Sequence, residues 1–112
     1  MSKNMQLKVS VLPYYNKDLK GSYPKLARHL GYLDSELVDQ NPSLYSLVGQ
    51  LDQILYRFDG TLLRDVLFRQ REKLQNIYKE LQEDIACWKL SQADKLLYSI
   101  EDIFDKIESD LD

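Results

Sequence analysis

The fold is decided by residues 62–88, which read LLRDVLFRQREKLQNIYKELQEDIACW. On a helix that advances about 100° per residue, the apolar side chains of this stretch fall on one face. They are Leu63, Val66, Leu67, Leu74, Ile77, Tyr78, Leu81, Ile85 and Trp88. The opposite face is charged, and neither glycine nor proline interrupts the run. The pattern predicts one long amphipathic helix over residues 62–89, whose apolar face must be covered because propensity alone rarely holds such a helix.

Two residues of this stretch depart from the pattern. Gln70 lies within the apolar face, where its amide either reaches past the edge to water or fixes the alignment of the packed helices. Phe68 lies on the charged side, so we expect the first third of the helix to have a second covered face. Either the N-terminal region or another chain could cover it, which makes Phe68 a candidate contact residue.

A second helix is predicted over residues 42–58. Asn41-Pro42 is typical of a helix start, and Asp59-Gly60 is typical of a helix end. Between them, one narrow arc contains Leu44, Leu47, Val48, Leu51, Ile54, Leu55 and Phe58. Gly49 lies on another flank, where it either lets a second backbone approach closely or is simply tolerated.

Two further segments complete the predicted fold. Ser91 and Asp94 resemble a capping box at the start of an amphipathic helix. Before the second helix, leucines recur at helical spacing after Pro24, and Gly31 predicts a break near Gly31–Asp34. The sequence therefore predicts an all-α fold, an antiparallel three- to four-helix bundle that occupies residues 24–112 as one domain. Its helices are expected near 24–39, 42–58, 62–89 and 92–111.

The first 23 residues are expected to form an extended arm and a connector. Apolar and polar side chains alternate over residues 5–12, which is the period of a short strand. No second strand is predicted to pair with it, so it either packs on the helices or pairs with a second copy or a target. The candidate contact residues of this region are Leu7, Val9, Tyr14 and Tyr15.

Composition narrows the function. The chain has 112 residues, a net charge of −3 and a single cysteine, so we expect no internal disulfide and no phosphate-based binding of nucleic acid. No apolar run approaches the ~20 residues that span a membrane, and we expect a cytoplasmic protein without a membrane partner. No nucleophile–base pair or phosphate-binding glycine loop is present, so the chain is interpreted as non-enzymatic.

The charge is concentrated in the last predicted helix. Residues 91–112 carry two basic and seven acidic side chains. Five of the carboxylates lie along one flank, and Tyr98, which lies off the apolar arc of this helix, is a candidate contact residue. The acidic row consists of Asp94, Glu101, Asp105, Glu108 and Asp112. Either Arg64 and Arg71 of the neighbouring helix neutralise this row, or a basic partner does. Because no Glu-x-x-His motif accompanies it, we expect neither a metal site nor a cofactor.

His29 is the only histidine, and it lies at the edge of a leucine-rich helix face. A small all-helical chain with such a histidine resembles histidine phosphotransfer modules in size and class. The resemblance implies that His29 would carry a phosphoryl group, although the following residues, Leu30-Gly31-Tyr32, lack the Lys-Gly pair of those modules. The other interpretation is a histidine at a helix edge with ordinary hydrogen bonds.

Three functional hypotheses follow. The first is a protein–protein interaction module, an adaptor or a regulatory subunit, which could also form a homodimer. The second is an acidic inhibitor or immunity-type protein that masks a basic enzyme surface. The third is the phosphotransfer domain. The candidate partner-binding residues are Leu7, Val9, Tyr14, Tyr15, Phe68, Asp94, Tyr98, Glu101, Asp105 and Glu108.

Overall fold

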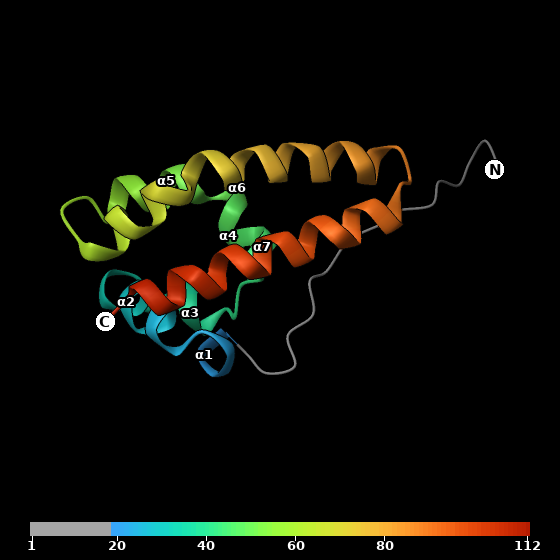
Figure 1. Cartoon of the computed structure of the whole chain (residues 1–112). Coiled ribbons are helices and arrows are strands. Elements are labelled where there is room, and N and C mark those ends of the chain that lie inside the picture. Colours follow the sequence, from blue (N-terminus) through green and yellow to red (C-terminus); the bar gives the residue numbers. More distant parts are fainter. Residues whose placement is uncertain (1–18) are drawn as a thin grey trace, which may run out of the picture.

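The computed structural model describes residues 19–112. These residues form seven α-helices and no strand, so the predicted all-α class is confirmed for them (Figure 1). The extended arm expected at 5–12 lies outside the described residues, as do its contact candidates Leu7, Val9, Tyr14 and Tyr15.

The long helix predicted at the centre of the sequence is present as α6, Leu62–Ala86. It begins where the Thr61 hydroxyl accepts a hydrogen bond from the backbone N–H of Arg64, at 3.2 Å. Leu63, Leu74 and Leu81 are fully buried along its length. The helix α7, Leu90–Asp110, runs beside it in the opposite direction and covers much of the apolar face (Figure 1).

The prediction that α6 extends to residue 89 is wrong, because the chain reverses at Trp88. The Trp88 N–H donates to the carbonyl of Ile85 at 3.1 Å, and the Lys89 N–H donates to that of Asp84 at 2.7 Å. These two bonds form a Schellman motif, which ends a helix with one residue in the left-handed region. That residue is Trp88, with φ +61°, and its side chain is 53% exposed instead of buried on the apolar face.

The start of α7 also differs from its prediction. The helix begins at Leu90, and its N-cap residue Lys89 makes no side-chain capping bond. The capping box expected from Ser91 and Asp94 is therefore not formed. The tight reversal at Trp88 places the first helical turn before Ser91, so these two side chains come too late to cap it.

The helix predicted over residues 42–58 is two helices, α4 (Leu44–Gly49) and α5 (Leu51–Arg57), which are separated at Gln50. Ser43, rather than Asn41, caps α4 and accepts from the backbone N–H of Ser46 at 3.0 Å. The break follows Gly49, which has the weakest helix propensity of this stretch. The apolar arc survives the break, because α5 still buries Leu51, Ile54 and Leu55.

Close packing at Gly49 involves a side chain rather than the second backbone that was considered. A Cβ atom at Gly49 would lie 2.9 Å from the hydroxyl of Tyr78 on α6. The Tyr78 ring in turn packs against Tyr45 of α4, with 4.9 Å between ring centroids. Because Gly49 has no side chain, α4 can approach the Tyr78 ring of α6 this closely.

In the described part of the chain, three helices precede α4. They are α1 (Leu19–Ser22), α2 (Pro24–Leu33) and α3 (Ser35–Asp39). The predicted break near Gly31–Asp34 is confirmed, since Asp34 ends α2 and its carboxylate accepts from the Leu37 N–H at 3.1 Å to cap α3. The connector expected up to residue 23 instead contains the helix α1. Its residue Leu19 is fully buried in the core.

One cluster of buried apolar side chains joins these helices. Gln70 is a buried polar residue of α6, 8% exposed, and its side chain makes no hydrogen bond with the described residues. No fully buried side-chain polar atom among residues 19–112 lacks a partner. The Gln70 amide therefore still touches solvent at the edge of the packed face, which favours the first of the two interpretations.

Candidate functional site

Two exposed aromatic side chains flank a shallow groove on α5 and α6, which we name the Tyr56–Phe68 surface. Tyr56 is 86% exposed and Phe68 is 51% exposed. The groove has a volume of about 380 Å³, and its lining includes Asp52, Tyr56, Asp59, Arg64, Phe68 and Arg71. No element among residues 19–112 covers Phe68, so the second covered face expected here stays open in the described part of the chain.

The arginines of this surface are held in place by neighbouring groups. The Arg64 guanidinium carbon lies 4.4 Å from the centroid of the Phe68 ring. Its nitrogens also pair with Asp65 at 3.5 Å and with Asp59 at 4.0 Å. Such a stacked and paired guanidinium loses little conformational freedom when a partner binds.

A second arginine is held in the same way further along α6. The Nε atom of Arg71 donates to Asp52 Oδ1 at 3.0 Å, and Gln75 Nε2 donates to the same oxygen at 3.0 Å. Arg64 and Arg71 therefore pair with Asp59, Asp65 and Asp52. The interpretation that these arginines neutralise the acidic row is wrong, because their partners come from α5, α6 and the turn between them.

Two residues toward the C-terminal end of the acidic row, Asp105 and Glu108, contact the start of α2 in the same chain. The two carboxylate oxygens of Glu108 accept from the backbone N–H groups of Lys25, at 2.6 Å, and Leu26, at 2.9 Å. The hydroxyl of Tyr23 donates to Asp105 at 3.0 Å. First-turn N–H groups have no partner within their own helix, and a carboxylate is well suited to bind them. Glu108 thus caps α2 from another helix.

The N-terminal part of the acidic row, Asp94 and Glu101, makes no such contacts. Asp94 and Glu101 form no hydrogen bond or ion pair with the described residues. Partial burial raises the pKa of Glu101, and the charges of Asp105, Asp102 and Asp94 raise it further. Tyr98 is 60% exposed on this helix. The candidate residues of α7 therefore fall into two groups: Asp105 and Glu108 bind the start of α2, whereas Asp94 and Tyr98 are exposed and Glu101 is partly buried.

His29 is half-buried at the end of the same α2–α7 contact. Its Nε2 atom lies 3.1 Å from the backbone oxygen of Asp112, which gives a hydrogen bond when that nitrogen carries a proton. The contact ties α2 to the last residue of the chain, and it occupies one of the two ring nitrogens.

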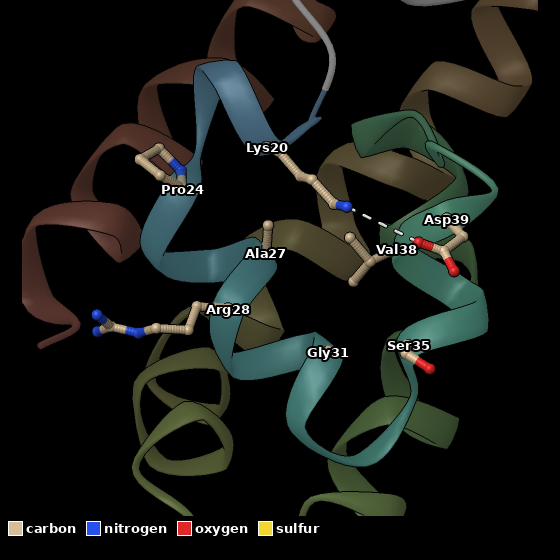
Figure 2. Close-up of a pocket in the computed structure, with 8 residues that line it drawn as sticks. All are labelled: Lys20, Pro24, Ala27, Arg28, Gly31, Ser35, Val38 and Asp39. Carbon is tan, nitrogen blue, oxygen red and sulfur yellow. Dashed lines mark ion pairs between the residues drawn. The ribbon is translucent and has the colours of Figure 1, made fainter.

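A groove between α1, α2 and α3 was not predicted from the sequence, and we name it the α1–α3 groove (Figure 2). Its volume is about 320 Å³, and its lining includes Lys20, Ala27, Arg28, Gly31, Val38 and Asp39. Figure 2 shows Lys20 reaching toward Asp39, with 3.8 Å between Nζ and Oδ1. Arg28 extends from the other side of α2 (Figure 2). The available signal was the run from residue 19 to 33, which carries three lysine or arginine side chains and no carboxylate.

Within residues 19–112, no three histidine, cysteine, aspartate or glutamate side chains are grouped as metal ligands. None of the helices in this range combines the length and the apolar character needed to cross a bilayer. No protein-family model, no curated protein and no solved structure matches the chain.

Proposed function

We propose that the chain is a small helical bundle that binds another protein through the Tyr56–Phe68 surface, as an adaptor or a regulatory subunit rather than as an enzyme. The observation that carries this proposal is Phe68, half exposed on a helix and overlaid by Arg64. Tyrosine, phenylalanine and arginine are enriched at the centres of protein interfaces. An aromatic pair beside a shallow groove suits a protein surface better than a small substrate.

The electrostatics of this surface favour binding of a protein without a strongly charged face. Arg64 and Arg71 already have carboxylate partners, so the surface is close to neutral over its width. A partner would not need to supply compensating charge, and most of the favourable free energy would come from burying Tyr56 and Phe68.

The proposal is tested by quantitative affinity capture from cells that produce the protein. Wild type is compared with the double variant Tyr56→Ser/Phe68→Ser and with Tyr32→Ser, a control that removes a similarly exposed ring outside the surface. We expect a protein that wild type and the control enrich equally and that the double variant enriches at least tenfold less. Equal enrichment of every captured protein by all three chains would contradict the proposal.

A second candidate function, the acidic inhibitor, is supported by the free carboxylates Asp94 and Glu101. It is tested in the same capture experiment with the variant Asp94→Lys/Glu101→Lys. Reversal at Asp105 or Glu108 would be a poor test, because those side chains bind α2. A basic partner that is lost with Asp94→Lys/Glu101→Lys but kept with Phe68→Ser would favour inhibition over the first proposal.

A further inference from the structure

The α1–α3 groove combines an apolar floor with charged side chains at its edge. Ala27, Gly31 and Val38 form the floor, Lys20 and Asp39 pair on one side of it, and Arg28 extends from α2 in the opposite direction (Figure 2). The volume of about 320 Å³ lies at the lower end of the range found for ligand sites. The groove can therefore accept one large side chain, with a negative charge nearby.

The charges around the groove favour an acidic occupant. The charged side chains that line the groove are Lys20, Arg28 and a single carboxylate, Asp39. Arg28 makes no ion pair or hydrogen bond with any residue in the described range. The pair between Lys20 and Asp39 is long, at 3.8 Å, and both side chains are largely exposed, so Lys20 can exchange this partner at little cost.

The same chain carries a complementary surface on α7. Asp94 and Glu101 lie one turn before and one turn after Tyr98, which is 60% exposed. Below them, the row already binds α2 of its own chain through Glu108 and Asp105. Those contacts reach backbone N–H groups and a hydroxyl at the start of α2, and they leave Asp94 and Glu101 without a hydrogen-bond or ion-pair partner among the described residues.

We propose that a second copy of the chain is the occupant: Tyr98 of one copy enters the α1–α3 groove of the other, and Asp94 and Glu101 approach Lys20 and Arg28. A pair related by a two-fold axis makes this contact twice and remains closed. The inference goes beyond the proposed function, because it uses none of the residues of the Tyr56–Phe68 surface. Either proposal can fail without the other.

The test is sedimentation velocity of the full chain over a series of concentrations, with two charge-reversed variants. We expect wild type to dimerise, and to do so more weakly at higher ionic strength. Arg28→Glu places a carboxylate against Glu101 of the other copy, and Glu101→Lys places an amine against Arg28. Each variant alone should dimerise at least tenfold more weakly than wild type.

Mixing the two variants gives the decisive observation. In a mixed pair, the Glu at position 28 meets the Lys at position 101, and the native Arg28 meets the native Glu101. We expect the equimolar mixture to recover the dimer that neither variant forms alone. Lys106→Glu, a charge reversal on α7 away from the acidic row, is the control and should leave dimerisation unchanged.

A third variant tests the groove independently of charge. A Cβ at Gly31 would lie 3.8 Å from Val38 Cγ2, an ordinary contact, so Gly31→Leu should fold and fill the floor of the groove. We expect this variant to be monomeric with unchanged helix content. A wild-type chain that stays monomeric up to roughly 1 mM, the range of the weakest specific contacts, would overturn the proposal. A dimer that survives all three changes would overturn it as well.

Discussion

Trp88 occupies a backbone conformation that disfavours every side chain, and a bulky one most. Its φ of +61° is in the left-handed region, and the two reverse hydrogen bonds at the end of α6 hold it there. Glycine is the usual residue at this position of a Schellman motif because it has no Cβ to clash. The end of α6 is therefore formed despite its residue type, which explains why the sequence pattern extended the helix through Trp88.

We predict that Trp88→Gly is more stable than Trp88→Ala by about 1 kcal/mol, the cost of a Cβ in the left-handed region. Both variants lose the same half-buried indole, so their difference isolates the backbone. Inside a helix the order of stability would be the reverse. Urea unfolding of the two variants measures the difference, and equal stability would show that the left-handed turn is absent.

Glu101 should make the stability of the fold depend on pH. Burial and the neighbouring carboxylates raise its pKa above the ordinary value of 4.5, so the folded state favours the protonated form. Its contribution to stability is fully present below the unfolded pKa and is lost as the pH rises through the folded pKa. We predict that Glu101→Gln raises the free energy of unfolding at pH 7 and that this gain fades toward pH 4. Denaturant titrations at several pH values measure it, and a gain that grows with acidity would contradict the assignment.

At the scale of the elements, the sequence predicts those helices and helix breaks that depend on local apolar periodicity and turn residues. The apolar repeat from Leu63 to Ile85 is sufficient to predict α6 as one rod, and Gly31 and Asp34 are sufficient to predict the break between α2 and α3. The division of residues 42–58 at Gln50 was missed, because the same apolar arc continues through α4 and α5. The arc reports which face is buried, but it does not report whether the backbone between the buried residues is continuous.

The packing of α4 on α6 should be sensitive to one added methyl group. Gly49→Ala gains helix propensity but places Cβ 2.9 Å from the Tyr78 hydroxyl. We predict a net loss of about 1 kcal/mol, since overpacking of a fitted contact costs more than the propensity supplies. In the Tyr78→Phe background, the nearest atom is Cζ at 3.3 Å, and the same change should cost less. Thermal unfolding of the four chains measures the coupling, and strict additivity would argue against this contact.

At the scale of the whole molecule, the helix α2 depends on α7. Glu108 and the two N–H groups that it binds are separated by more than 80 residues, and no local pattern relates them. For this reason the acidic row was assigned to a basic partner or to Arg64 and Arg71. The sequence shows the acidic row itself, but only the packing of the whole chain determines that α2 lies beside it. The α1–α3 groove was missed for the same reason.

We predict that Glu108→Ala destabilises the fold by about 1 kcal/mol, in the range of a lost helix cap, and that Glu108→Gln costs less because its amide oxygen still accepts one bond. Asp110→Ala, two residues further along α7 and exposed, is the matched control and should have little effect. Hydrogen exchange should show the loss first at the amides of Lys25 and Leu26. Unchanged exchange there in Glu108→Ala would contradict the contact.

The hydrogen bonds between Glu108, in the last turn of α7, and the start of α2 also set an order of events during synthesis. The ribosome makes Lys25 and Leu26 more than 80 residues before Glu108, the residue whose carboxylate binds their amides. The same holds for Leu19 and Leu111, which lie at the two ends of one buried cluster. A nascent chain therefore cannot complete the N-terminal cap of α2 until the last turn of α7 has left the exit tunnel.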